Sequence, residues 1–223
     1  MDQQRKKSNS IFTYLRYKYR EVRYGGEFLK RLIWRFMRLF GQRGKRCAWD
    51  GQYESGYWRD LSSKDSELIE IIEDFSRGGK IVSLGCGADD IILKLNPHVY
   101  SSYLGIDISK VAIEHAIDNA KRLGLTNCQF CVGDIAEWEG DKNITLIILE
   151  ESIYYLNSGQ QQRLLERCYD SLNSNGSVLI TVHSRYKHEK TINRCKEISK
   201  VVKEINKGEK TYLILKSVHN GKN

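Results

Sequence analysis

An apolar, strand-like run ends in a turn that holds two glycines. Residues 81–84 lead directly into Gly85, Cys86 and Gly87. Glycine lets a backbone approach a ligand closely where a Cβ atom would collide, and a helix starting beyond the turn would offer unpaired N–H groups to that ligand. Glycine-rich turns also occur for steric reasons alone. By itself, the segment leaves ligand binding and simple turn formation equally open.

A carboxylate follows each of the next two apolar runs. Asp107 stands 22 positions after Gly85, close to the offset of about 20 residues at which an acidic group accepts hydrogen bonds from both ribose hydroxyls. Asp134 ends the third run, where it could accept from an adenine amino group. Asp107 could instead form a turn ahead of Ser109. We expect Gly85, Asp107 and Asp134 to converge on one adenosine-shaped crevice.

Groups that could serve a reacting acceptor follow the fourth and fifth apolar runs. Glu150 and Glu151 come after the fourth run and His183 after the fifth. Each could act as a general base, which typically contributes about 10² to 10⁴ in rate. Tyr154 and Tyr155 could form walls of the acceptor pocket. Each also has a structural alternative, because Glu151 could cap a helix, the tyrosines could be core residues and a lone histidine is more often structural.

The elements that must position these residues follow from hydrophobic periodicity. From residue 80 onward, strand-length apolar runs alternate with helical patterns, which indicates repeated βαβ units. Predicted strands, each apolar enough to be buried on both faces, cover residues 81–84, 103–106, 129–132, 144–149 and 177–182. Two further runs, 200–206 and 210–218, are joined by a turn with Gly208 and predict a hairpin. The fold class is therefore α/β, a Rossmann-like, doubly wound, mostly parallel seven-stranded sheet ending in an antiparallel hairpin.

Three helices are predicted within this domain. Apolar residues at positions i, i+3, i+4 and i+7 predict a helix over residues 68–75, terminated by Gly78 and Gly79. After the second strand, Ser109 can cap a helix and Gly124 can close it. The buried stripe of that helix would consist of Ile113, Ala116, Ile117 and Ala120. A third helix is expected over residues 158–172.

The charge of the chain divides it into two regions. The net charge is +8, yet residues 1–46 hold 14 Lys/Arg against three acidic residues, so the remainder is slightly acidic. We therefore divide the chain into a basic, aromatic arm (1–46) and a domain (47–223). In the arm, residues 27–40 form an amphipathic pattern that Gly41 and Gly44 would end.

Three functions are open for the arm, in decreasing order of preference. Its helix could pack on the domain as a lid whose long basic side chains keep their charges in water. It could attach to an anionic membrane surface through residues 27–40, where Trp34 and Phe36 alternate with arginines. It could also bind RNA through stacking and phosphate contacts. The second alternative would place the protein peripherally on the inner face of the membrane.

The cysteines and the absence of long apolar segments indicate a cytoplasmic protein without a metal. Six cysteines in a chain without a secretory segment are expected to be reduced thiols. Cys128 and Cys131 form a CxxC, but strand alternation places them on opposite faces, and no second pair or nearby His completes a zinc site. No apolar stretch approaches the roughly 20 residues needed to span a bilayer.

Taken together, four motifs resemble those of the class I S-adenosylmethionine-dependent methyltransferases. They are IVSLGCG (81–87), LGIDI (104–108), VGDI (132–135) and LEESIYYL (149–156), within a resemblance that covers residues 49–218. The resemblance implies that the glycine turn wraps the methionyl part of the cofactor, that Asp107 takes the ribose and that Asp134 with Ile135 takes the adenine. The implied cofactor contacts are Leu84, Gly85, Cys86, Gly87, Asp107, Ile108, Asp134, Ile135 and Glu150, and the catalytic candidates are Glu151, Tyr154 and His183.

Within that family, the run 151–156 is similar to the branch that includes the nodulation N-methyltransferases, which act on chitooligosaccharides. The aromatic stretch 49–58 is similar to the segment that many small-molecule enzymes fold over cofactor and acceptor. The chain departs from the family at Ser83, where an acidic residue is common, and at Ala88, where a third glycine is absent. Asp89 could substitute for the missing acid, and Asp90 follows it.

We expect an S-adenosylmethionine-dependent methyltransferase that methylates oxygen or nitrogen of a small-molecule or glycan acceptor. One alternative is an RNA methyltransferase that uses the basic arm, and another is a catalytically weak cofactor-binding partner module. No Asn/Asp-Pro-Pro-Tyr/Phe motif follows the fourth strand, which argues against exocyclic-amine methylation of nucleic acids. The incomplete GxGxxG and the terminal hairpin argue against a nicotinamide dehydrogenase.

Overall fold

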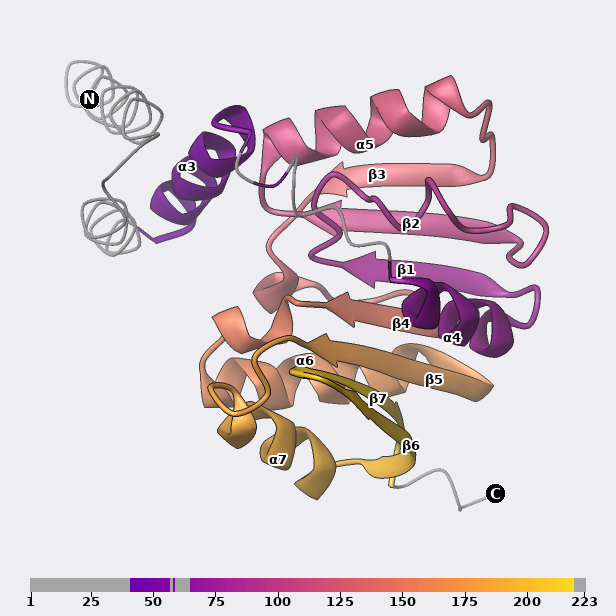
Figure 1. The fold of residues 1–223 in the computed structure, drawn as a ribbon, viewed down its shortest axis with the longest axis vertical. Coiled ribbons are helices and arrows are strands. Elements are labelled where there is room, and N and C mark those ends of the chain that lie inside the picture. Colours follow the sequence, from indigo (N-terminus) through magenta and orange to yellow (C-terminus); the bar gives the residue numbers. More distant parts are fainter. Residues whose placement is uncertain (1–40, 57, 59–64, 219–223) are drawn as a thin grey trace.

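A computed structural model describes residues 41–56, 58 and 65–218 of the chain (Figure 1). The predicted amphipathic helix over residues 27–40 lies outside the described residues, as does most of the basic arm. In the part of the chain that is described, no helix is both long enough and apolar enough to cross a membrane.

Seven strands form one sheet in the order β3-β2-β1-β4-β5-β7-β6 (Figure 1). Neighbouring strands among β1 to β5 run parallel, whereas β7 runs antiparallel to β5 and to β6. This arrangement confirms the predicted α/β class and the terminal hairpin. The strands are β1 (Lys80–Leu84), β2 (Ser102–Asp107), β3 (Cys128–Val132), β4 (Ile144–Glu150), β5 (Leu172–Val182), β6 (Lys200–Lys207) and β7 (Lys210–Lys216).

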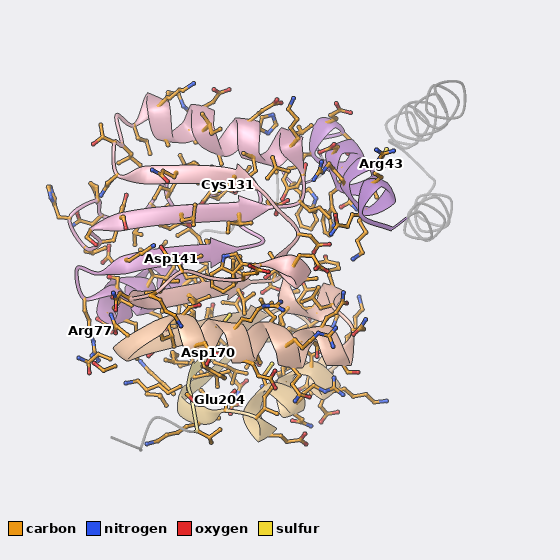
Figure 2. The ribbon with its side chains drawn as sticks, turned by 180° about the vertical axis from the view of Figure 1, so that it is seen from behind. Arg43, Arg77, Cys131, Asp141, Asp170 and Glu204 are labelled. Atoms are coloured by element: carbon orange, nitrogen blue, oxygen red, sulfur yellow. The ribbon has the colours of Figure 1, made fainter. Side chains whose placement is uncertain are left out.

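Helices cover both faces of the sheet. Alternate strand residues divide into two buried clusters, with Val82 and Ile147 in one and Ile81 and Ile148 in the other. The first cluster packs under α6 and α7 and the second under α4; α6, with Asp170, crosses the rear face in Figure 2. The helices are α3 (Gly41–Glu54), α4 (Ser66–Ser76), α5 (Lys110–Arg122), α6 (Ser158–Ser171) and α7 (Glu189–Glu197), with 3-10 turns η2 (Ile135–Glu137) and η3 (Ile153–Tyr155).

The predicted signals at the two ends of α5 are confirmed. Ser109 Oγ accepts from the Ala112 amide at 3.2 Å and caps α5. Gly124 has a φ of +66° just beyond that helix, a conformation that most side chains resist. Both residues therefore set the ends of the helix that follows β2.

Three expectations about local structure are wrong. No helix follows Gly87, because residues 88–99 form turns in which Asp89 has a left-handed φ of +55°; a helix cannot propagate through such a residue. Gly44 lies inside α3 rather than ending a helix. β3 is mostly exposed because it is an edge strand, and Cys131 lies on its uncovered face (Figure 2).

Candidate active site at the carboxyl edge of the sheet

A cavity of about 850 Å³ opens at the carboxyl ends of the parallel strands. The structure brings Gly85, Asp107 and Asp134 together in its wall, as expected for one crevice. The order of the sheet reverses between β1 and β4 at this point, which is where open α/β sheets usually bind ligands. The predicted site residues that line the cavity are Gly85, Cys86, Gly87, Asp107, Ile108, Asp134, Ile135, Glu150, Glu151, Tyr154 and His183.

Leu84 alone among the predicted site residues is not part of the cavity wall. Its side chain is fully buried in the cluster under α6. Its carbonyl oxygen accepts a hydrogen bond from Ser152 Oγ at 2.8 Å. Leu84 therefore anchors the end of β1 and positions the glycine turn that follows it.

The glycine turn is held tightly against β2 and against the loop after β4. The amides of Gly85 and Cys86 both donate to the Ile106 carbonyl oxygen, at 2.7 and 3.0 Å. Gly85 has a φ of +78°, and a Cβ atom there would lie 2.6 Å from Ser152 Cβ. At Gly87, with a φ of +59°, a Cβ atom would lie 2.4 Å from Tyr53 Oη. Both positions therefore favour glycine.

Asp107 connects the glycine turn to the start of α5. Its Oδ2 accepts from the Gly87 amide at 3.0 Å and its Oδ1 from the Ser109 amide at 2.8 Å. Burial raises the pKa of Asp107 to about 6, and these two amide hydrogen bonds oppose the rise. Each carboxylate oxygen can accept more than one hydrogen bond. Asp107 therefore retains acceptor capacity toward a ligand in the cavity.

The helix α3 packs against the same side of the cavity, beyond the carboxyl ends of the strands (Figure 1). Asp50 Oδ1 accepts from Ser109 Oγ at 2.7 Å and from the Val111 amide at 3.3 Å, which docks α3 on the start of α5. Lys45 Nζ lies 3.5 Å from Asp134 Oδ2. The proposed boundary between arm and domain, at residue 46, falls inside α3.

Asp134 also has a local structural role. Its Oδ1 accepts from the Ala136 amide at 3.0 Å and caps η2. Ile135 is the first residue of η2 and is buried beside the cavity. Arg46 Nε donates to the Ile108 carbonyl oxygen at 3.2 Å. The loops that end β2 and β3 are thus both tied to α3.

Aromatic side chains from α3 and η3 meet across the cavity. Trp49 lies edge-on to Tyr155 with ring centroids 4.9 Å apart, and Trp58 lies 6.0 Å from Trp49. Tyr53 stacks near Trp58 at 6.2 Å. Such contacts bury large, rigid apolar surfaces. Trp49, Tyr53 and Trp58 therefore form an aromatic wall of the cavity together with Tyr155.

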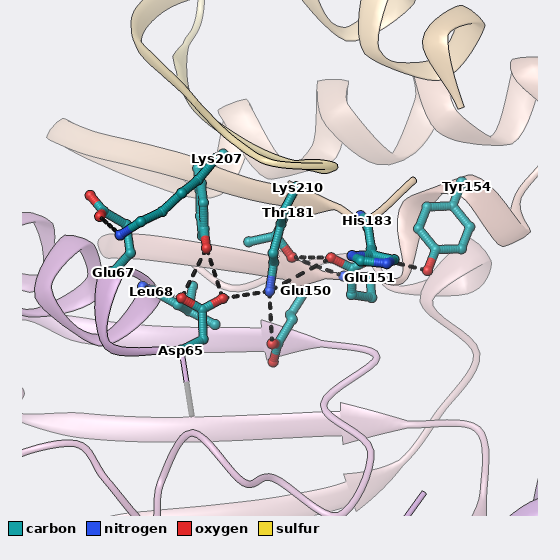
Figure 3. A network of polar contacts seen from close by, with 11 residues as sticks. Asp65, Glu67, Leu68, Glu150, Glu151, Tyr154, Thr181, His183, Lys207 and Lys210 are labelled. Atoms are coloured by element: carbon teal, nitrogen blue, oxygen red, sulfur yellow. Dashed lines mark hydrogen bonds and ion pairs between the residues drawn. The ribbon is translucent and has the colours of Figure 1, made fainter. Parts of the chain in front are cut away.

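Glu151 organises the loop after β4. Its backbone has a left-handed φ of +49°. Its Oε2 accepts from Tyr154 Oη at 3.0 Å and from the His183 amide at 2.7 Å, and its Oε1 accepts from Thr181 Oγ1 at 3.0 Å (Figure 3). The carboxylate therefore joins β4, β5 and η3 through donors of the protein itself.

Tyr154 and His183 differ in their exposure to solvent. The Tyr154 ring stacks on His188 at 4.0 Å, and burial raises the pKa of Tyr154 well above its usual range, so its hydroxyl remains a donor. His183 is exposed, with Nε2 3.8 Å from Glu209 Oε2 at the rim of the cavity. Tyr154 is thus held rigidly, whereas the His183 imidazole is accessible from solvent.

Sequence reasoning missed a cation that reaches the same end of the cavity. Lys210 Nζ, at the start of β7, lies 2.6 Å from Asp65 Oδ2 and 3.8 Å from one oxygen each of Glu150 and Glu151 (Figure 3). Tyr212 Oη also donates to Asp65, at 2.9 Å. Although burial acts against it, hydrogen bonds from Lys210 and the Leu68 amide lower the pKa of Asp65.

Comparison with known proteins decides the family. Residues 75–219 match the family model described as a methyltransferase domain. The chain belongs to this methyltransferase family. The structure of the methyltransferase is similar to that of the N-methyltransferase NodS from Bradyrhizobium japonicum WM9, solved with S-adenosyl-L-homocysteine. The TM-score is 0.59 at 18% identity, covering 75% of this chain and 99% of that chain.

Two curated relatives match shorter parts of the methyltransferase. A 2-heptyl-1-hydroxyquinolin-4(1H)-one methyltransferase of Mycobacteroides abscessus is 26% identical over 110 residues, which are 47% of this chain and 48% of that protein. An uncharacterized RNA methyltransferase of Clostridium tetani is 36% identical over 80 residues, 34% of this chain. The chain spans 17% of the length of that second protein.

The methyltransferase domain uses S-adenosylmethionine, and its cavity suits that molecule. The volume of about 850 Å³ lies within the roughly 300 to 1,000 Å³ of ordinary ligand pockets. The backbone of Gly85 and Gly87 and the carboxylates of Asp107 and Asp134 line one continuous wall. No cluster of His, Cys, Asp and Glu that could hold a metal ion occurs among the residues that were described.

Proposed function

We propose that the protein transfers the methyl group of S-adenosylmethionine to a small-molecule or glycan acceptor. The acceptor would bind at the Glu150 end of the cavity. The observation that carries this proposal is the composition of the cavity wall. Its acidic members are Asp65, Asp89, Asp90, Asp107, Asp134, Glu150 and Glu151, against the lysines Lys45, Lys94 and Lys210. A wall with this excess of carboxylates repels a phosphodiester backbone, whose binding depends on clusters of Lys and Arg.

Residues at one end of the cavity would bind the cofactor, and residues at the other end would bind the acceptor. Bound S-adenosylmethionine supplies an already activated methyl group, so the protein mainly has to hold and orient the reactants, which can contribute about 7 to 11 kcal/mol. Asp107 and Asp134 would hold the adenosine part. Tyr155 and Trp49 would exclude water from the acceptor end. The Glu151 carboxylate accepts hydrogen bonds from Tyr154, His183 and Thr181. Glu151 would therefore orient Tyr154 and His183.

Asp89 is our candidate for the acid missing at Ser83. Its carboxyl group is buried below the glycine turn, with Oδ1 accepting from Tyr103 Oη at 3.0 Å, and it lies beside the cavity. Burial raises the pKa of Asp89 to about 7. We propose that it contributes negative potential at the methionyl end rather than a direct contact.

The acceptor class can be tested by following a labelled methyl group. The full-length protein would be incubated with radiolabelled S-adenosylmethionine, at a concentration well below saturation, and fractionated cell extract, with the Asp107→Asn variant as the comparison of weakened cofactor binding. Label in nuclease-resistant material of low molecular weight supports the proposal. Label that ribonuclease releases from large RNA would contradict it and favour the RNA alternative, toward which the name of the Clostridium tetani relative points.

For the basic segment that precedes α3 in the sequence, we propose a role as a lid over the cavity. Lys45 and Trp49 of α3 line the cavity, and the basic segment directly precedes α3 in the sequence, which is why we prefer a lid. Attachment of residues 27–40 to an anionic membrane is the alternative and would place a cytoplasmic enzyme at the membrane surface. If residues 27–40 attach to a membrane, the unmodified protein should sediment with anionic vesicles, and replacing Arg31, Arg35 and Arg38 by Gln should abolish this. If the segment is a lid, neither protein should sediment with the vesicles.

A further inference from the structure

We infer that the acceptor end of the cavity is a subsite for an organic ammonium group, with Glu150 as its charge partner in place of the cofactor contact that the sequence resemblance implied for it. The inference rests on the proposed methyl transfer and narrows its acceptor to an amine. The bound ammonium group must first lose a proton, which the Glu150 carboxylate can accept; the nitrogen lone pair then forms the bond to the methyl carbon as the S–CH3 bond breaks and S-adenosyl-L-homocysteine leaves. It depends on the polar network at the ends of β4 and β7 (Figure 3). Neither Lys210 nor Asp65, which complete that network, was part of the sequence-based site.

The charges of the network do not balance. One ammonium group, Lys210 Nζ, faces three carboxylates, those of Asp65, Glu150 and Glu151. Lys210 lies 2.6 Å from Asp65 but 3.8 Å from each of the other two, so its charge is directed chiefly to Asp65. A second cation would therefore find uncompensated negative charge at Glu150 and Glu151.

Glu150 is the carboxylate with free acceptor capacity. Asp65 accepts from Lys210, Tyr212 Oη and the Leu68 amide, and Glu151 accepts from three donors of its own. In the part of the chain that the structure describes, the Glu150 carboxylate accepts no hydrogen bond, and its contact is the 3.8 Å approach of Lys210. Glu150 lines the cavity, so a bound donor would meet it directly.

The surroundings of Glu150 select among chemical classes of ligand. A carboxylate or phenolate ligand would be repelled by Glu150 and Glu151, and a neutral hydroxyl could donate a hydrogen bond to Glu150 but would lack the attraction between opposite charges. An ammonium group gains both a charge-assisted hydrogen bond and the faces of neighbouring aromatic rings such as Tyr154 and Tyr155. Trp49 and Tyr155, which line the same cavity, offer apolar surface to the organic part of an arylalkyl amine.

Protonation of Glu150 provides a signature of this contact. Burial raises the pKa of Glu150 to about 7, and Lys210 opposes the rise. Other charged groups that act on Glu150 are Glu151 beside it, Asp65 at the start of α4, and Asp89 and Asp90 after β1; Asp89 titrates in the same range. Because Glu150 loses its charge as the pH falls below about 7, its attraction for an ammonium group should weaken over the same range.

The test uses three probes of similar shape and different charge. Benzylammonium, benzyl alcohol and benzoate would be titrated by calorimetry into the full-length protein saturated with S-adenosyl-L-homocysteine. We expect benzylammonium to bind about tenfold or more tightly than benzyl alcohol, as for a charge-assisted hydrogen bond worth at least ~1.4 kcal/mol. Its affinity should fall when the pH is lowered through 7, whereas benzoate should not bind.

Variants separate a charge partner from a structural residue. Glu150→Gln should remove both the preference for benzylammonium and its pH dependence, while the exposed Glu139→Gln control should change neither. Lys210→Met should strengthen benzylammonium binding because a competing cation is gone. Equal binding of the alcohol and the ammonium probe, or an unchanged preference in Glu150→Gln, would overturn the inference. If the unmodified protein does not bind S-adenosyl-L-homocysteine, this would instead contradict the proposed function.

Discussion

The buried carboxyl group of Asp89 should make stability depend on pH in a measurable way. Asp89 is only 1% exposed and has a left-handed φ of +55°. Its Oδ1 accepts from Tyr103 Oη and from the Ile92 amide, whereas Oδ2 is buried without a hydrogen-bond partner among the described residues. Burial raises the pKa of Asp89 to about 7. Replacing Asp89 by Asn removes the charge and keeps the shape.

The magnitude follows from proton linkage. An unfolded Asp titrates near ~3.9, so the folded group, with a pKa of about 7, binds more protons between these two values. The free energy of unfolding therefore falls as the pH rises. The stabilisation that Asp89 contributes is complete below the pKa of the unfolded state and is lost as the pH rises through the pKa of the folded state. A difference of about three units corresponds to ~4 kcal/mol. Asp89→Asn should abolish that part of the pH dependence.

Urea unfolding at about pH 5 and about pH 8 measures the part of this effect that lies above pH 5. The loss of stability between these two pH values should be smaller in the variant by ~2 to 3 kcal/mol. Any cost of burying the Asn amide is the same at both pH values and cancels. The exposed Asp118→Asn change on α5 is the matched control. Identical pH dependence in Asp89→Asn and in the unmodified protein would refute the linkage argument.

Two further substitutions test the contacts that shape the cavity. Gly85→Ala should lower the free energy of unfolding by ~1 to 3 kcal/mol more than Gly208→Ala; both glycines have a positive φ, but only at Gly85 would a Cβ atom meet Ser152, 2.6 Å away. Equal losses in urea unfolding would show that backbone conformation alone matters. Asp50→Ala should lower the free energy of unfolding by about 1 to 3 kcal/mol, because the buried Ser109 hydroxyl and the Val111 amide at the start of α5 lose their acceptor. An unchanged free energy of unfolding would contradict the docking of α3 on α5.

Local patterns in the sequence predicted the sheet and the adenosine side of the cavity. Asp107 and Asp134 were identified because each follows an apolar run, and parallel strands bring their carboxyl ends to one edge. The same logic found Glu150 and Glu151. These residues share an origin at strand ends, so their convergence follows from topology without knowledge of side-chain packing.

The remaining features depend on contacts that no local pattern contains. Asp65 and Lys210 are 145 positions apart, and their pairing appears only when β7 inserts beside β5. The helix α7 was missed because its buried residues are few, namely Thr191, Ile192 and Cys195. The exposure of β3 follows from its position at the sheet edge, which the composition of the strand does not reveal.

The central claim is that Asp107 holds the adenosine part of the cofactor in the cavity. Calorimetric titration of S-adenosyl-L-homocysteine into the unmodified protein, Asp107→Asn and the Asp118→Asn control tests it most directly. We predict that Asp107→Asn weakens binding by about 10-fold to 150-fold, as expected for hydrogen bonds to a charged group worth ~1.5 to 3 kcal/mol, while the control binds normally. Equal affinity of a folded Asp107→Asn variant and the unmodified protein would contradict the account.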